Sequence, residues 1–306
     1  MLRSQDGTCR YPVLHDVPIL INEQRSVFRI SDYRAADQDG AARTGVVERI
    51  LAGIDGRLPS LSRNVGSDAN YRQLARLMGD KQRPRVLIVG GRIAGVGFDA
   101  LLDDPNVDCI DVDAALGPRT SIVCDAHDLP FRDSCFDGVV CQAVLEHVLD
   151  PVRVVSEIHR VLVPDGLVYS EIPFMYPQHG APYDFTRFTM LGHRRLYRWF
   201  DELQTGVQCG PGMALGFSLV SFLRALPRSR LGRAIATRAG ALLFFWLKYL
   251  DDWLVSHPSA REAAGGTFFL GRRRSEPLAD DALILADSGT ASAAAGADAP
   301  GREPLR

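Results

Sequence analysis

The stretch from Asp125 to Gly166 constrains the fold of this chain more than any other part of the sequence. A short apolar run, Gly138–Gln142, precedes a segment whose aliphatic residues recur at helical spacing, Pro151–Leu162. Pro164-Asp165-Gly166 ends the helix, and Leu167–Ile172 is apolar again. A buried strand, an amphipathic helix and a second buried strand in this order indicate a parallel sheet. Open sheets of this kind bind ligands at the carboxyl ends of their strands.

Four short motifs lie in this stretch. They are D-A-x-x-L-P-F from Asp125, F-D-x-V from Phe136, L-E-H-V from Leu145 and R-V-L-x-P-x-G from Arg160. Together they resemble class I S-adenosylmethionine (SAM)-dependent methyltransferases, and among these the methyltransferase-11-like group. The resemblance extends over residues 85–172. It implies SAM as cofactor and an α/β fold, a Rossmann-like three-layer sandwich around a mostly parallel seven-stranded sheet with an antiparallel edge hairpin.

The resemblance also suggests how the domain ends. We expect a SAM-dependent methyltransferase domain over residues 81–272, with Glu202–Cys209 and Thr267–Gly271 as the two strands of the edge hairpin. Residues 211–264 would then be a helical C-terminal insertion between these strands.

The segments on either side of this domain have a different composition. Residues 31–80 predict a linker with a short helix near Val46–Ile54, followed by a leading helix that in the resembled family covers the SAM pocket. Residues 273–306 are rich in Ala, Gly, Asp and Ser and predict a disordered tail.

Residues 1–30 resemble the end of a small zinc-ribbon module, similar to the partner subunits of some tRNA methyltransferases. The resemblance rests on Tyr11, Pro12, Pro18 and Leu20. A zinc ribbon needs about four Cys or His ligands, whereas this segment offers Cys9 and His15. We therefore expect a degenerate ribbon-like module, or a plain hairpin packed on the main domain, and in either case no metal ion.

A glycine-rich loop follows the first expected strand of the domain. Glycine lets the backbone approach a ligand closely, and the resemblance implies that Gly90, Gly91 and Gly95 hold the methionine end of SAM. The loop departs from the family form acidic-x-G-x-G-x-G, because Ile88 and Arg92 occupy an acidic and a glycine position. A ligand-free turn, a dinucleotide-binding loop and an inactive protein stay open as alternatives.

Acidic residues stand at the tips of the next two strands. Asp113 is placed to accept hydrogen bonds from both ribose hydroxyls, and Asp111 would then point to the other face. The resemblance implies that Asp125 and Ala126 hold the adenine amine of SAM. The alternative for each carboxylate is a solvated loop residue.

Glu146 and His147 follow the fourth strand. In the resembled family this histidine commonly lies near the sulfonium and the acceptor. An imidazole that titrates near neutral pH can act as a general base. It can equally donate a structural hydrogen bond beneath the pocket, so both roles stay open for His147.

The loop HGAPYDFTRFT, His179–Thr189, follows the fifth strand and carries the expected acceptor site. It resembles methyltransferases of bacterial polysaccharide and glycolipid biosynthesis. Its aromatic and polar residues suit a sugar ring, and a His179–Asp184 pair would supply the base for a hydroxyl acceptor. The alternative is a structural loop in which Asp184 pairs with Arg187.

Residues 216–254 are apolar with interleaved arginines. Such a segment can lie in a membrane interface and suit a lipid-linked acceptor. It can equally form helices that cover the sheet or build a homodimer interface. The longest apolar run, Ala239–Leu247, is too short to span a bilayer.

Net charge and cysteine content limit the possible partners, metal sites and location of the protein. A net charge of −2 over 306 residues argues against a nucleic-acid partner. The six cysteines are scattered and form no C-x-x-C pair, which favours buried free thiols and disfavours a metal site. We therefore expect a cytoplasmic protein, with the inner membrane face as the alternative location.

These patterns predict a SAM-dependent methyltransferase. The family resemblance favours O-methylation of a sugar in a glycan or glycolipid. The alternatives are a quinone-like or other small lipid acceptor and, in another class, a non-catalytic binding partner with a SAM-type fold. A nicotinamide oxidoreductase is a more distant alternative.

Overall fold

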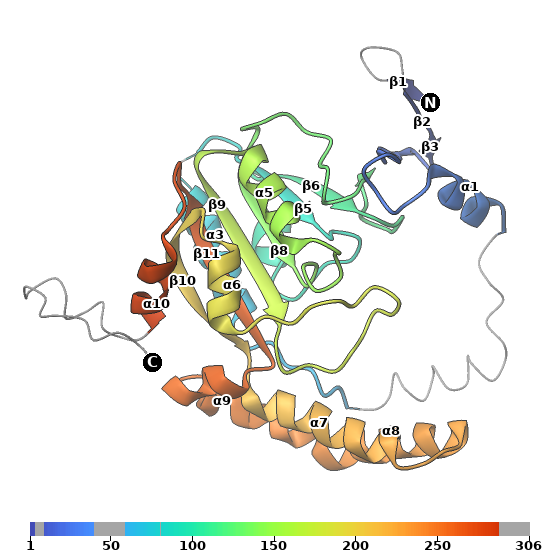
Figure 1. Ribbon diagram of the computed structural model, residues 1–306, viewed down its shortest axis with the longest axis vertical. Coiled ribbons are helices and arrows are strands. Elements are labelled where there is room, and N and C mark those ends of the chain that lie inside the picture. Colours follow the sequence, from blue (N-terminus) through green and yellow to red (C-terminus); the bar gives the residue numbers. More distant parts are fainter. Residues whose placement is uncertain (4–8, 40–58, 80, 288–306) are drawn as a thin grey trace, which may run out of the picture.

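The computed structural model describes residues 1–3, 9–39, 59–79 and 81–287, and its centre is a seven-stranded sheet (Figure 1). The strand order is β10-β11-β9-β8-β5-β6-β7. Neighbouring strands are parallel from β9 to β7, whereas β11 runs antiparallel to both β9 and β10. The expected α/β fold with an antiparallel hairpin at one end of the sheet is confirmed.

The strands follow the apolar runs of the sequence, because the central ones are buried on both faces. All four residues of Val86–Val89, for example, are buried. The strands are β5 (Arg85–Val89), β6 (Asp108–Asp113), β7 (Ile122–Val123), β8 (Phe136–Gln142), β9 (Leu162–Pro173), β10 (Phe200–Cys209) and β11 (Gly266–Arg273).

Two helices, α5 (Pro151–Val161) and α6 (Met190–Leu196), lie on the near face of the sheet in Figure 1. The side chain of Asp150 caps α5 by accepting a hydrogen bond from the backbone N–H of Arg153, and Pro151 suits the first turn. The buried face of α5 consists of Val154, Val155, Ile158 and Val161. Burying an aliphatic side chain of this size contributes roughly 1.5–3 kcal/mol, so this stripe fixes α5 on the sheet.

The opposite face of the sheet carries α3 (Ser67–Met78) and α4 (Asp99–Leu102). Tyr71, Leu74 and Met78 of α3 pack in one buried cluster with residues of β5, β8 and β9. The leading helix therefore packs against the sheet.

The N-terminal segment forms two small hairpins, β1 (Leu2–Arg3) with β2 (Arg10–Tyr11) and β3 (Val13–Leu14) with β4 (Val17–Pro18). After β4 the chain joins the edge of the large sheet, where Ile19 forms a parallel bridge with Val123. Ile19 and Ile21 are buried against Val123. Helix α1 (Ile30–Asp39) follows. The short helix predicted near residues 46–54 lies outside the described residues.

Residues 211–264 are helical, as expected of the insertion, and consist of α7 (Pro211–Ala225), α8 (Arg230–Phe244), η1 (Phe245–Leu250), α9 (Asp251–Leu254) and η2 (Pro258–Ala263). In Figure 1 α7 and α8 form a hairpin beyond the carboxyl ends of β8 and β9. The buried carboxylate of Asp251 fixes its base, because it accepts hydrogen bonds from the backbone N–H groups of Gly212 and Met213. In the described part of the chain, none of the helices combines the length and apolarity that a membrane crossing requires.

The segment after β11 differs from the predicted disordered tail. Residues Asp280–Asp287 form helix α10, which contacts α6. Leu283 is buried, and Asp280 pairs with Arg195 and Arg198. Composition indicated disorder, but one buried leucine and two ion pairs hold this part of the tail against α6. Residues 288–306 lie outside the described residues.

Candidate functional site

A cavity of about 460 Å³ lies at the carboxyl ends of β5, β6 and β8. Its volume falls within the range of small-molecule sites, roughly 300–1,000 Å³. The walls come from the strand tips, the N-terminal segment and the loop between β9 and α6, here called the 174–189 loop. The lining includes Phe28, Gly90, Asp113, Ala126, Val144, His147, Gly180 and Tyr183. Among the described lining residues none belongs to α3, so the N-terminal segment covers the cavity where the resemblance implied the leading helix.

The three glycines predicted to bind the cofactor have different surroundings. Gly90 lines the cavity with φ +78°, and a Cβ there would lie 2.3 Å from Cγ2 of Val144. Gly91 and Gly95 lie outside the lining. An added Cβ would lie 2.6 Å from Asp111 Oδ1 at Gly91 and 1.8 Å from Gln142 Oε1 at Gly95, so the side chains of Asp111 and Gln142 occupy the space beside these glycines.

The two aspartates of β6 are two residues apart, so the alternation along a strand places their side chains on the same face, and the expectation that Asp111 points to the other face is wrong. They differ in their partners. Asp113 lines the cavity, and its carboxylate accepts hydrogen bonds from the backbone N–H groups of Ala115 (2.9 Å) and Arg92 (3.3 Å). Asp111 is buried and pairs with Arg119 at 2.8 Å. Burial raises the pKa of Asp111. The structure thus places the carboxylate of Asp113, and not that of Asp111, beside the cavity.

Asp125 and Ala126 both line the cavity, but the carboxylate of Asp125 is occupied by protein groups. It accepts hydrogen bonds from the hydroxyl of Ser26 (2.6 Å) and from the backbone N–H and Nδ1 of His127 (2.9 and 2.6 Å). Burial would raise the pKa of Asp125, but these hydrogen bonds lower it overall. Asp125 therefore fastens the N-terminal segment over the cavity.

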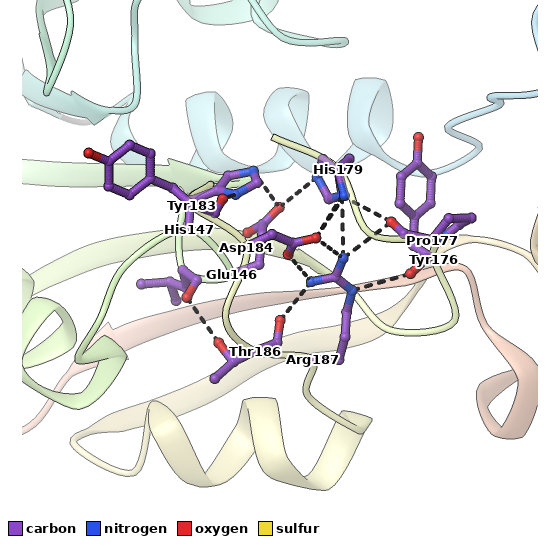
Figure 2. Close-up of polar contacts among 10 residues, drawn as sticks. Glu146, His147, Tyr176, Pro177, His179, Tyr183, Asp184, Thr186 and Arg187 are labelled. Carbon is purple, nitrogen blue, oxygen red and sulfur yellow. Dashed lines mark hydrogen bonds and ion pairs between the residues drawn. The ribbon is translucent and has the colours of Figure 1, made fainter. Parts of the chain in front are cut away.

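Glu146 and His147 follow β8 at the edge of the cavity, and Figure 2 shows how they face His179 of the 174–189 loop. The side chain of Glu146 is 1% exposed, and among the described residues neither carboxylate oxygen has a hydrogen-bond partner. Its Oε1 lies 3.7 Å from Nε2 of His147 and 3.6 Å from Nε2 of His179. The imidazoles are 27% and 35% exposed. A buried carboxylate thus faces two accessible rings.

The imidazole of His147 is held in place from both sides. Its Nδ1 lies 2.5 Å from the carbonyl oxygen of Tyr183 and donates a hydrogen bond to it. Gly180 has φ +68°, and a Cβ there would lie 2.7 Å from Cε1 of His147. Glycine at position 180 therefore gives the ring the space that it occupies.

The predicted base pair of His179 and Asp184 is not formed. Nδ1 of His179 lies 3.8 Å from Oδ2 of Asp184, beyond hydrogen-bond distance. The Asp184 carboxylate instead accepts two hydrogen bonds from Arg187 and one, at 2.7 Å, from the backbone N–H of His179. Arg187 holds the pKa of Asp184 at about 2. Asp184 therefore shapes the loop, the alternative that its sequence left open, and Glu146 is the carboxylate that faces the His179 ring and raises its pKa.

The chain is similar to several solved structures at low sequence identity. The [4+2]-cyclase SpnF is 17% identical with a TM-score of 0.43, over 76% of this chain and 94% of that chain. The YcgJ protein of Bacillus subtilis is 17% identical with a TM-score of 0.39, over 68% and 100%. A phosphoethanolamine N-methyltransferase of Haemonchus contortus is 14% identical with a TM-score of 0.45, over 81% and 61%. Similarities of this size carry no inference about function. No curated protein matches the chain.

A family model described as a methyltransferase domain matches residues 101–170. The match contains the tips of β6 and β8 and the cavity residues Asp113, Asp125 and His147, whereas the tip of β5 precedes it. The chain is a SAM-dependent methyltransferase. The enzyme class and the cofactor expected from its motifs are therefore confirmed.

Three features of the methyltransferase site were missed by sequence reasoning. Ser26 and Phe28 reach the cavity from a segment far from it in sequence, and no local pattern marks them. The third is that the Glu146 carboxylate has no hydrogen-bond partner among the residues that the structure describes. The sequence signal for Glu146 is its neighbour His147, because an acidic residue next to a candidate catalytic histidine is itself a candidate member of the site.

Proposed function

We propose that this methyltransferase transfers the methyl group of SAM to a hydroxyl group of a saccharide. The observation that carries the proposal is the group of Glu146, His147 and His179, here called the histidine cluster, at the edge of the cofactor cavity. A sugar hydroxyl is a weak nucleophile, so its methylation requires a group that removes its proton or lowers its pKa.

The cavity residues fit SAM in shape and chemistry. Asp113 would accept hydrogen bonds from the ribose hydroxyls, since its carboxylate receives only backbone donors among the described residues and borders the cavity. Gly90 would allow the close approach of the methionine end, and Ala126 with Val144 would contact the adenine. When bound, SAM supplies a methyl group on a positively charged sulfur, which keeps the S–CH₃ electron pair as the methyl joins the acceptor oxygen.

The histidine cluster would activate the acceptor. His147 lines the cavity, so an acceptor bound there meets its accessible imidazole. An imidazole of the cluster can take the hydroxyl proton directly. A cation held by the cluster would instead lower the pKa of the hydroxyl, so that the proton leaves to water.

Aromatic rings beside the cluster support a sugar acceptor. Tyr183 is 43% exposed and Phe185 is 44% exposed, although both are large apolar side chains. The ring of Phe28 lies 5.9 Å from that of Tyr183. Exposed rings next to polar groups suit a sugar, whose C–H face packs on aromatic faces while its hydroxyls form hydrogen bonds.

The α7–α8 hairpin supports a lipid-linked form of this acceptor. It meets the 174–189 loop, where the rings of Tyr176 and Phe217 lie 4.6 Å apart. At its tip Leu226 and Leu231 are 64% and 72% exposed. Exposed arginines surround them: Arg224, Arg228, Arg230 and Arg233. Apolar side chains among cations suit an anionic membrane surface.

A methyl-transfer assay with isotopically labelled SAM tests the acceptor. Lipid-linked and free saccharides are offered in parallel with quinol-type and phospholipid acceptors. We expect label in a saccharide as an ether that survives mild alkali. Label in the quinol or phospholipid alone would refute the saccharide proposal.

Vesicle sedimentation tests the membrane contact. We expect binding to vesicles with anionic phospholipid, weaker binding to neutral vesicles, and loss of binding in the Leu226→Asp, Leu231→Asp double variant. Thr237→Asp, on α8 away from the tip, is a matched charge control. If vesicles are not bound and the double variant instead dissociates a dimer in sedimentation velocity, the hairpin is a homodimer interface.

A further inference from the structure

The buried Glu146 carboxylate of the histidine cluster has no donor within hydrogen-bond distance in the described part of the chain. A buried carboxylate without a hydrogen bond is costly, because burial removes its water without replacement. Glu146 is in this position among the described residues, with both oxygens unpartnered. At 3.6 and 3.7 Å its contacts with the two Nε2 atoms are too long for hydrogen bonds.

The backbone decides which nitrogen of each imidazole carries the proton. Nδ1 of His147 donates to the carbonyl oxygen of Tyr183. Nδ1 of His179 lies 3.2 Å from the carbonyl oxygen of Pro177. Arg187 Nη2 is also near this nitrogen, but its two protons are directed at Asp184 Oδ2 (2.8 Å) and Pro177 O (3.2 Å). In their neutral forms, both rings therefore direct the lone pair of Nε2 at the carboxylate of Glu146.

Two imidazole lone pairs and a carboxylate thus converge on one point. Their three ligand atoms lie within 4.8 Å of one another. Metal-binding histidines generally donate their other ring N–H to a carbonyl or carboxylate, as both of these do. Ligand bonds of about 2.0–2.2 Å in a tetrahedral site separate ligand atoms by about 3.3–3.6 Å, close to the distances from Glu146.

We propose that Glu146, His147 and His179 bind a divalent transition-metal ion such as Zn²⁺. Mixed imidazole and carboxylate ligands suit this class of ion, whereas Mg²⁺ prefers oxygen ligands. Three protein ligands leave a position open, as in catalytic zinc sites. His147 borders the cavity, so this position is available to an acceptor oxygen. The role of the ion in activating a hydroxyl rests on the proposed function, but its binding does not.

Calorimetric titration of the full chain, freed of metal with a chelator, tests the site with Zn²⁺, Co²⁺ and Mg²⁺ alone. We expect one Zn²⁺ or Co²⁺ per chain at this site, a visible Co²⁺ absorption band and no Mg²⁺ binding. Glu146→Gln, His147→Ala and His179→Ala should each weaken Zn²⁺ binding at least about 100-fold, since even residues that only orient ligands alter metal affinity 10–100-fold. His257→Ala, which removes an exposed imidazole elsewhere, should leave it unchanged.

Several results would overturn this site. They are the absence of Zn²⁺ and Co²⁺ uptake by the wild-type chain, unchanged binding in the three variants, and uptake that Cys9→Ala removes but Glu146→Gln retains. The last result would place the ion in the N-terminal module. Circular dichroism and SAM affinity verify that the variants fold. If Glu146→Gln does not fold, His179→Ala decides, because its side chain is partly exposed.

Metal binding is measured without an acceptor, so its failure differs from failure of the proposed function. Saccharide methylation without metal uptake would refute the ion and leave an imidazole as base. Metal uptake without saccharide methylation would uphold the site and refute the acceptor.

Discussion

The carboxylates near the two sides of the cavity, the cofactor side at the tips of β5 and β6 and the acceptor side at the histidine cluster and the 174–189 loop, have different partners. On the cofactor side, Asp113 receives backbone N–H groups from its own loop and from the glycine loop, and Asp111 pairs with Arg119. On the acceptor side, Asp184 is fully engaged by Arg187, whereas Glu146 has no hydrogen-bond partner among the described residues. The cofactor half is therefore complete in its polar contacts, and the acceptor half needs a group from outside the chain.

The largest effect should come from His147→Ala. If the histidine cluster activates the acceptor, turnover should fall by about 10²–10⁴, the range for loss of a general acid or base. SAM affinity should stay close to that of the wild type, because Asp113 and Gly90 are untouched. Single-turnover rates and SAM titration on the same preparation measure both quantities.

A purely structural role for His147 gives the opposite result. Loss of its hydrogen bond to Tyr183 would then lower the melting temperature, while turnover per folded molecule stayed unchanged. Melting curves recorded beside the kinetics separate the two outcomes.

Asp184→Ala tests the ion pair between Asp184 and Arg187 on the acceptor side of the cavity. Removing one partner of a buried ion pair costs about 3–5 kcal/mol, and we expect about 3 kcal/mol here because Arg187 is 24% exposed. Urea denaturation measures this loss of unfolding free energy. Turnover per folded molecule should fall far less than in His147→Ala. If turnover falls as far as in His147→Ala and the unfolding free energy is unchanged, Asp184 takes part in catalysis.

Local patterns and the family resemblance together predicted most of the fold and the placement of Asp113, Asp125 and Ala126 at the cavity. Helix α5 lies within one residue of its predicted end, because its cap at Asp150, Pro151 and its apolar stripe are all local. The position of Asp113 at the tip of β6 follows from the strand pattern, whereas Arg119, the partner of Asp111, comes from the loop after β6. The environment of Glu146 could not be predicted this way, because it depends on where the 174–189 loop places His179.

Local patterns also could not predict that the N-terminal segment covers the cavity. The hydrogen bond from Ser26 to Asp125 joins residues far apart in sequence, and neither residue signals the other. Helix α10 is a further case, since burial of Leu283 depends on contact with α6. Composition reports the average polarity of a segment and misses such single contacts.

Asp113→Ala tests the proposed ribose contact on the cofactor side of the cavity. Loss of a charged hydrogen-bonding group should weaken SAM binding by roughly 1.5–3 kcal/mol. Asp111→Ala is the matched control, because Asp111 pairs with Arg119 away from the cavity. It should alter stability and leave SAM affinity unchanged. Equal SAM affinity in a folded Asp113→Ala protein would remove Asp113 from the ribose site.

The smallest effect concerns His193, which lies under the acceptor half between Ser170 of β9 and Thr267 of β11. Burial lowers its pKa from 6.5 to about 3, so the folded protein keeps it neutral. The unfolded chain takes up this proton near pH 6.5. The stability that depends on neutral His193 is therefore complete above that pH and is lost progressively as the pH falls toward 3.

At pH 5 this loss should reach about 2 kcal/mol relative to pH 7.5. Urea denaturation of the wild type and of His193→Gln at both pH values, with a chelator present, isolates it: the variant should lose correspondingly less stability between pH 7.5 and 5. NMR of the imidazole gives a direct measurement on the unmodified chain. A midpoint near 6.5 for His193 would mean that water reaches this ring, and that the layer beneath the acceptor half is more open than its contacts indicate.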